Sequence, residues 1–197
     1  MKLPIIILVR HGETEWNVEG RYQGTLNSPL TLKGKEQAKE NALKIKKVVD
    51  LEQPFKIFSS PLGRAKESAF IICELLRINK NRIIFDERIQ EFNYGIFEGK
   101  TKNECKEQYA KILENREADK WSYQIEGGES YMIVTERLKL WLEFVSDEKV
   151  IIMVAHEMVN RALRGIYCQL ESKDMLLLRQ PNNMLIKLEN GVENIVN

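Results

Sequence analysis

The chain has 197 residues, 30 lysines and arginines against 29 aspartates and glutamates, and a formal net charge of +1. This length suits one domain over residues 1–197, and the balanced charge gives no general attraction to nucleic acid or to an acidic membrane. The apolar run near the N-terminus is too short to span a bilayer, no signal peptide is evident, and three cysteines without CxxC spacing suit a reducing cytoplasm rather than a zinc site.

Strand-like and helix-like segments alternate along the first half of the chain, which predicts an α/β fold with a mainly parallel sheet. In order, we expect a strand at 3–9, a loop at 12–29, a helix at 32–49, a strand at 55–58, a helix at 61–76, a strand at 83–85 and a loop at 86–99. Thr31 is the expected N-cap of the first helix, and Pro61 suits the first turn of the second.

The second half begins with a charged, partly helical stretch and then returns to strongly apolar runs. In order, we expect partial helix at 101–120, a break at Gly127-Gly128, a helix at 130–145, a strand at 150–154 and a helix at 159–167. Asn190-Gly191 separates two apolar runs at 184–188 and 192–196, which is a strong hairpin signal and predicts an edge ribbon.

The chain contains only two histidines, and each follows one of the strongly apolar runs. His11 comes after residues 5–9, and His156 comes after residues 150–155. Continuous β-branched runs are typical of strands buried on both faces of a parallel sheet, and ligands bind beyond the carboxyl ends of such strands. We therefore expect both histidines at one functional edge, rather than two unrelated surface or capping histidines.

Four motifs carry a resemblance to a known family. They are Arg10-His11-Gly12, Arg64 within Ser59–Ala65, Glu91 within Gln90–Gly99, and Ala155-His156 followed by Arg161. With these motifs in this order, the chain resembles the histidine phosphatase superfamily, also called the phosphoglycerate mutase-like family. The resemblance covers most of the chain and implies a three-layer sandwich in which helices flank a mainly parallel central sheet.

Phosphoryl transfer requires an in-line nucleophile and neutralisation of the charge on the phosphate oxygens. We expect neutral His11 to attack phosphorus and carry the phosphoryl group as a covalent intermediate. Arg10 and Arg64 can present guanidinium forks to phosphate, and His156 can donate hydrogen bonds to the same oxygens. Salt bridging at the surface is the alternative for a lone arginine, but two arginines beside paired histidines favour phosphate binding.

The leaving group needs a proton, and the attacking water must later lose one, so one carboxyl group can serve both steps. Glu91 is the expected acid and base because it lies in a loop after a strand and matches the family's acidic position. Glu13, next to the nucleophile motif, is the alternative, and Glu98 is expected to support the loop.

The resemblance also places further residues at the substrate: Asn17, Gln23, Gly24, Tyr94 and Lys102. Local hydrogen bonding within the loop is the alternative for Asn17 and Gln23, a solvated surface position is the alternative for Lys102, and Trp16 is expected to pack. Glu157 occupies a position that is glycine in many family members. Its carboxylate either opposes a highly anionic substrate, points away from the site, or favours substrates with a positive or hydroxyl-bearing portion.

The superfamily contains phosphatases and mutases that share the nucleophile. This chain is short beside typical mutases, and its 99–127 segment mixes acidic with basic residues, so we expect a phosphatase acting on a small phosphorylated metabolite. The alternatives are a cofactor-dependent phosphoglycerate mutase, which alone would require 2,3-bisphosphoglycerate, and a catalytically dead phosphate-binding module.

The expected partner is a small-molecule phosphomonoester, with a homodimer as a further possibility, and neither nucleic acid, a membrane nor a metal is expected. Sugar phosphates, phosphoglycerates, a nucleotide-loop phosphate such as α-ribazole phosphate and phosphoprotein all stay open as substrates.

Overall fold

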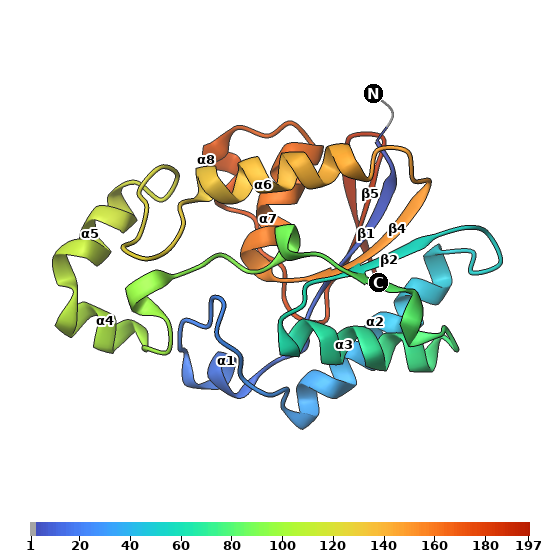
Figure 1. Cartoon of the computed structure of the whole chain (residues 1–197), viewed down its shortest axis with the longest axis horizontal. Coiled ribbons are helices and arrows are strands. Elements are labelled where there is room, and N and C mark those ends of the chain that lie inside the picture. The colour runs from blue at the N-terminus through green and yellow to red at the C-terminus, as the bar shows by residue number, and fades with distance from the viewer. Residues whose placement is uncertain (1–2) are drawn as a thin grey trace.

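The computed structural model describes residues 3–197 and has a six-stranded sheet at its centre (Figure 1). The strands are β1 (Ile5–Arg10), β2 (Lys56–Ser59), β3 (Ile83–Phe85), β4 (Val150–Ala155), β5 (Leu185–Glu189) and β6 (Val192–Val196). Their order in the sheet is β3-β2-β4-β1-β5-β6. The first four strands are mutually parallel where they pair, and the β5–β6 hairpin joins β1 in antiparallel orientation, so the predicted parallel sheet with an edge ribbon is confirmed.

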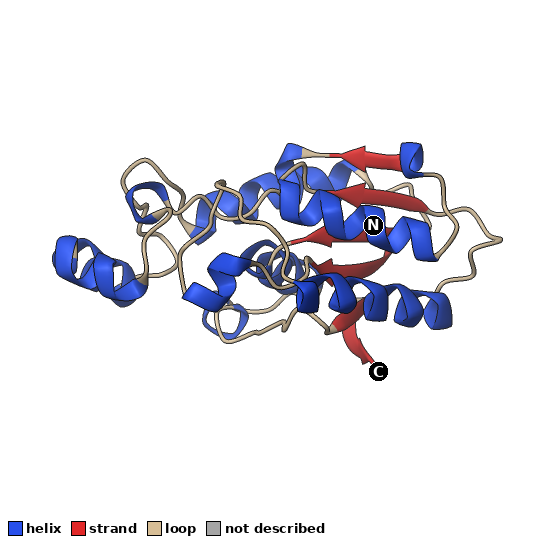
Figure 2. Ribbon diagram, turned by 90° about the horizontal axis from the view of Figure 1, so that it is seen from below, coloured by secondary structure: helices blue, strands red, loops and turns tan. Residues whose placement is uncertain are grey.

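Helices lie on both sides of this sheet (Figure 2). They are α1 (Glu15–Glu19), α2 (Leu32–Val48), α3 (Gly63–Leu75), α4 (Lys102–Gln108), α5 (Ala110–Ala118), α6 (Tyr131–Phe144), α7 (Glu157–Tyr167) and α8 (Ser172–Met175). Short 3-10 turns lie at Lys80–Arg82, Glu87–Ile89 and Gly95–Phe97. Helices α4 and α5 lie at the end of the molecule away from the strands (Figure 1).

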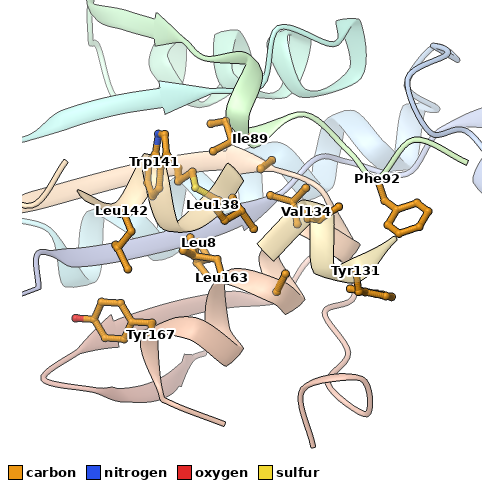
Figure 3. Packing of buried hydrophobic residues seen from close by; sticks show 14 of the residues in the cluster. Leu8, Ile89, Phe92, Tyr131, Val134, Leu138, Trp141, Leu142, Leu163 and Tyr167 are labelled. Atoms are coloured by element: carbon orange, nitrogen blue, oxygen red, sulfur yellow. The ribbon is translucent and has the colours of Figure 1, made fainter. Parts of the chain in front are cut away.

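Alternate residues of the central strands face two separate hydrophobic cores. Ile6 and Leu8 of β1 pack with α6 and α7, including Leu138 and Trp141 (Figure 3). Ile7 and Val9 face the other way and pack with α2 and α3. Because side chains alternate across a strand, the continuous apolar runs are explained by burial on both faces, and the predicted three-layer arrangement is confirmed.

Strand register brings the ends of three strands to one edge. Arg10 pairs with Ala155, and the His11 amide donates to the Ala155 carbonyl at 3.0 Å. The Ser60 amide, after β2, donates to the Val154 carbonyl at 3.0 Å. The residues that follow β1, β2 and β4 are therefore neighbours, although they are far apart in the sequence.

Some element predictions are wrong in detail. The loop expected at 12–29 contains α1, and the loop expected at 86–99 contains two 3-10 turns. Pro61 lies before the helix rather than in its first turn, because Leu62 is the N-cap. Helix α7 begins at Glu157, directly after His156, two residues earlier than expected. Within residues 3–197, the structure contains no helix long and apolar enough to cross a membrane.

Candidate active site

A pocket of about 290 Å³ collects most of the predicted site residues. The predicted residues that line it are Arg10, His11, Asn17, Gln23, Gly24, Arg64, Glu91, Tyr94 and Lys102. His156 lies behind this lining, fully buried, with its ring centroid 5.1 Å from that of His11. All the predicted site residues are thus at the pocket or directly behind it.

His11 is held in one orientation by backbone groups. Its Nδ1 lies 2.7 Å from the Gly12 carbonyl, and a carbonyl can only accept, so Nδ1 carries the proton and Nε2 keeps its lone pair. A Cβ at Gly12 would collide with the Gly34 carbonyl, so glycine is needed for the close packing of this turn on α2. Burial and the neighbouring Arg64 and Arg10 hold the pKa of His11 well below its usual value. The ring is therefore neutral at pH 7 and its Nε2 is nucleophilic.

The guanidinium group of Arg64 faces the Nε2 atom of His11. It lies in the first turn of α3, and its two terminal nitrogens donate to the carbonyls of Leu26 (2.6 Å) and Gly24 (2.7 Å). Its Nε donates to His11 Nε2 at 3.3 Å. Burial lowers the pKa of Arg64 to about 10, so the guanidinium stays charged at pH 7. Because its hydrogen-bonding partners are neutral, this buried charge is available to an anion beside His11.

His156 is oriented by Ser60, a residue for which no role was predicted. The His156 Nε2 lies 2.8 Å from Ser60 Oγ, which also accepts from the Leu62 amide at 3.3 Å. With that amide donating to its oxygen, the hydroxyl can donate to Nε2, which leaves the imidazole proton on Nδ1. In that tautomer Nδ1, which is buried without a partner among the described residues, can donate to a phosphate oxygen. Burial, together with Arg64, lowers the pKa of His156 well below its usual value.

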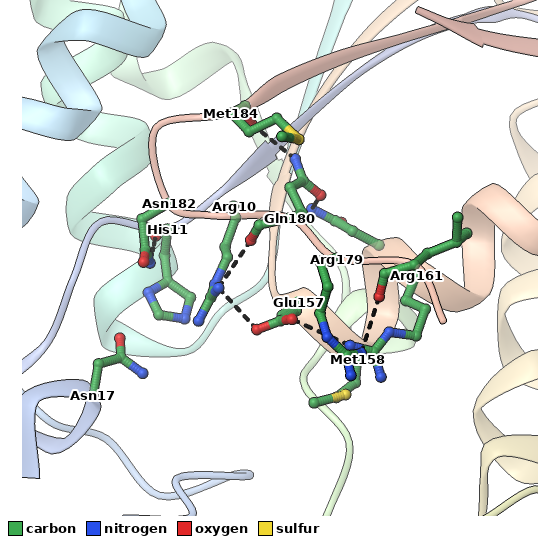
Figure 4. A network of polar contacts seen from close by, with 12 residues as sticks. Arg10, His11, Asn17, Glu157, Met158, Arg161, Arg179, Gln180, Asn182 and Met184 are labelled. Atoms are coloured by element: carbon green, nitrogen blue, oxygen red, sulfur yellow. Dashed lines mark hydrogen bonds and ion pairs between the residues drawn. The ribbon is translucent and has the colours of Figure 1, made fainter. Parts of the chain in front are cut away.

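Arg10 is positioned by one carbonyl and one carboxylate. Its Nη1 donates to the Gln180 carbonyl at 2.8 Å and pairs with Glu157 at 2.8 Å (Figure 4). Its Nε is buried without a partner among the described residues. Glu157 lines the pocket rather than pointing away from it. This position fits the expectations in which the carboxylate meets the substrate, and not the one in which it points away.

Glu91 is almost completely buried at the pocket, and one carboxyl oxygen accepts from the Phe92 amide at 2.9 Å. Burial raises the pKa of Glu91, although Arg64 and Arg10 act in the opposite direction. A raised pKa keeps this carboxyl protonated to higher pH, as a general acid requires. Glu13 binds Lys33 at 2.9 Å and the Thr31 hydroxyl at 3.1 Å, which lowers its pKa and makes it a poor proton donor.

The residues farther from His11 both line the pocket and hold the surrounding loop in place by hydrogen bonds. The Asn17 side chain accepts from the Thr14 amide at 3.1 Å, and Gln23 donates to the Thr14 hydroxyl at 2.7 Å. Glu98 accepts from Thr25 and from the Tyr94 amide, which fits its expected support of the loop. Trp16 also lines the pocket, contrary to the expectation that it only packs.

No role was predicted from the sequence for several residues that shape the site. They are Ser60, Arg21, Met158, Gln180 and Asn182, the last of which donates to the His11 carbonyl at 2.7 Å. Ser60 lies inside one of the motifs, so only its role was missed. Over residues 3–197, no group of three or more His, Cys, Asp or Glu side chains is placed to hold a metal ion.

The fold and the pocket define an α/β protein in which two histidines and two arginines lie together at one edge of the sheet. A profile of the histidine phosphatase superfamily (branch 1) matches residues 6–194. The chain belongs to this superfamily.

Named relatives include both phosphatases and mutases. Phosphoserine phosphatase 1 of Hydrogenobacter thermophilus is 34% identical over 173 residues, which cover 86% of this chain and 77% of the relative. A protein of Escherichia coli O1:K1 named probable phosphoglycerate mutase GpmB is 38% identical over 147 residues, 72% of this chain and 63% of the relative. That match spans less than two thirds of the E. coli protein. The solved structure of Bacillus stearothermophilus YhfR superposes with a TM-score of 0.79 at 28% identity, covering 98% of this chain and 95% of that one.

Proposed function

We propose that the protein is a metal-independent phosphatase that hydrolyses small phosphomonoesters through a phosphohistidine at His11. The observation that supports this most strongly is the state of His11. Its Nδ1 proton is held by the Gly12 carbonyl, and its Nε2 lone pair faces a buried guanidinium. A phosphoryl oxygen beside Nε2 would accept the hydrogen bond that Arg64 Nε now donates to His11. The same arrangement therefore serves both nucleophilic attack and neutralisation of the phosphate charge.

The proposed reaction has two half-reactions. In the first, His11 Nε2 forms a bond to phosphorus, the ester P–O bond breaks, and the leaving oxygen takes the Glu91 proton. In the second, water attacks phospho-His11, gives a proton to the Glu91 carboxylate, and the P–N bond breaks to release phosphate. Arg10, Arg64 and His156 bind the phosphoryl oxygens in both steps.

The choice of a phosphatase is supported by the relative named phosphoserine phosphatase and by the mixture of acidic and basic residues in the 99–127 segment. The relative named phosphoglycerate mutase supports a mutase as the second candidate, for which 2,3-bisphosphoglycerate would be the cofactor. A cytoplasmic location is part of the proposal, since the three cysteines are unpaired, as a reducing compartment favours.

The test has two parts. With a chelator present, the enzyme is mixed with p-nitrophenyl phosphate and quenched with alkali, because a phosphohistidine is stable in base and labile in acid. Mass spectrometry under non-acidic conditions should find one phosphoryl group on His11. His11→Asn should abolish both the adduct and phosphate release, and Glu143→Gln, an exposed change on α6, should alter neither. Conversion of 3-phosphoglycerate to 2-phosphoglycerate that outpaces phosphate release from every ester tested would instead favour the mutase.

A further inference from the structure

The Glu157 carboxylate stands between two cavities. One is the phosphate pocket described above. The other, which we call the annex, has a volume of about 290 Å³ and shares five lining residues with the pocket: Tyr22, Tyr94, Lys102, Glu157 and Met158. Because Glu157 is the first residue of α7, directly after His156, its backbone is fixed relative to the nucleophile.

Two arginines hold the carboxylate in place. One oxygen lies 2.8 Å from Arg10 Nη1, and the other lies 3.2 Å from Arg161 Nη2. Arg161 also donates to the Tyr131 hydroxyl at 2.8 Å. In Figure 4 the Arg10 guanidinium lies between His11 and Glu157. A phosphoryl group at His11 is thus shielded from the carboxylate by Arg10, whereas a part of the substrate that extends towards the annex meets it directly.

The annex itself contains other charges. Arg116 and Lys120 pair with Glu117 at 3.3 and 2.6 Å, whereas Lys102 and Arg179 line the annex with no ion pair among the described residues. Glu157 therefore opposes the attraction that these cations would exert on a second anionic group. Lys102 and Arg179 are exposed, so solvent and salt screen their charges, whereas the Glu157 side chain is 20% exposed and its charge is screened less.

We propose that Glu157 is a specificity-determining residue. It weakens the binding of phosphomonoesters that carry a second phosphate or carboxylate beside the reacting phosphate, relative to those whose alcohol part is neutral. This inference rests on the proposed function, since it assigns the substrate class of that same pocket. It also gives a physical reason for water, rather than a bisphosphorylated ligand, to be the main acceptor.

The test compares two inorganic anions of different charge. Inhibition constants of phosphate and of pyrophosphate are measured against p-nitrophenyl phosphate for the wild type, Glu157→Gln, Glu157→Asp and the control Glu143→Gln. In Glu157→Gln, binding of pyrophosphate relative to phosphate should strengthen by about tenfold at low salt. This gain should shrink to about twofold near 1 M salt, where the Debye length is about 3 Å. Glu157→Asp and Glu143→Gln should keep the wild-type ratio.

The inference is overturned if Glu157→Gln leaves the ratio unchanged or if its effect is independent of salt. It is also overturned if Glu157→Asp, which keeps the charge, changes the ratio as much as Glu157→Gln does. A variant that does not fold is replaced by Glu157→Gly, which also removes the charge. Should the wild type hydrolyse no ester, the proposed function fails. The same ratio, taken from calorimetric binding of the two anions, would still decide the role of Glu157.

Discussion

At the scale of single residues, burial moves the pKa values of His11 and Glu91 in opposite directions. It lowers the pKa of the imidazole, so the proposed nucleophile stays neutral, and it raises the pKa of the carboxyl, so the proposed acid holds its proton to higher pH than a free carboxyl does. Both groups are ready for the first half-reaction at pH values above the pKa of His11 and below that of Glu91. One desolvated pocket thus prepares a nucleophile and an acid together.

Glu91→Gln should therefore separate substrates by leaving group. With alkyl phosphates, kcat/KM should fall by about 10²–10⁴-fold, because their alkoxide must be protonated as the bond breaks. With p-nitrophenyl phosphate it should fall by less than about tenfold, since this leaving group is stable as an anion. The wild-type kcat/KM for alkyl phosphates should also decline as pH rises through the raised pKa of Glu91, and this decline should vanish in the variant. Equal losses for both substrates would exclude Glu91 as the acid.

Ser60→Ala should weaken catalysis through His156. Without the hydroxyl, the imidazole proton is no longer directed to Nδ1, and one buried nitrogen loses its partner. We expect kcat/KM to fall by about tenfold and inhibition by vanadate to weaken in parallel, whereas Ser60→Thr, which keeps the hydroxyl, should restore most of both. Full activity in Ser60→Ala would show that His156 is held without this hydrogen bond.

At the scale of elements, α1 connects the nucleophile to the wall of the pocket. The fully buried Thr14 caps this helix by accepting from the Asn17 amide at 3.2 Å, and its hydroxyl also accepts from the Gln23 side chain at 2.7 Å. The Asn17 side chain bonds back to the Thr14 amide, which completes a capping box. A five-residue helix without a buried face depends on such a cap for its stability.

Thr14→Ala should destabilise helix α1 by removing its N-cap. The unfolding free energy should drop by about 1–2 kcal/mol, as is typical when an N-cap hydroxyl is lost. KM should rise more than kcat falls, because Asn17 and Gln23 line the pocket and His11 is untouched. Urea denaturation and steady-state kinetics measure the two effects, and Thr14→Ser is the matched control that keeps the cap. An unchanged KM would mean that the cap does not order the pocket wall.

Elements with a long apolar signal were predictable from the sequence, and short ones were not. Strands β1 and β4 and the β5–β6 hairpin follow from apolar runs and Asn190-Gly191. Helices α1 and α8 were not predicted, because they are short and lack a stripe of buried apolar residues along one face. At the site, motif residues such as His11 were predictable. Gln180 and Asn182 were not, because they act through contacts with residues about 170 positions away, which no local pattern encodes.

At the scale of the whole molecule, the active site affects the dependence of stability on pH. The chain has only two histidines, and both are buried with lowered pKa values. The unfolded chain therefore binds more protons than the folded one as pH falls below about 6.5, and stability decreases there. Glu91, with a raised pKa, acts in the opposite sense. Its contribution to stability is lost as pH rises through its pKa in the folded state.

We expect the unfolding free energy to fall between pH 7.5 and 5.5, with a slope of at most about 1.4 kcal/mol per pH unit for each histidine. His156→Gln should flatten this slope, because one of the two imidazoles is removed. Urea denaturation at several pH values measures it, with Glu143→Gln as a control that should keep the wild-type slope. A slope as steep in His156→Gln as in the wild type would show that this histidine does not contribute.

The register of β1 with β4 has a consequence for how activity first arises on a growing chain. During synthesis β1 is made long before its partner β4, because Ile5 of β1 pairs with Val150 of β4. Until then the nucleophile has no Ala155 carbonyl to hold its amide and no second histidine beside it. Nascent chains stalled before β4 should thus be inert, and refolded enzyme should regain turnover only with this slow, long-range pairing.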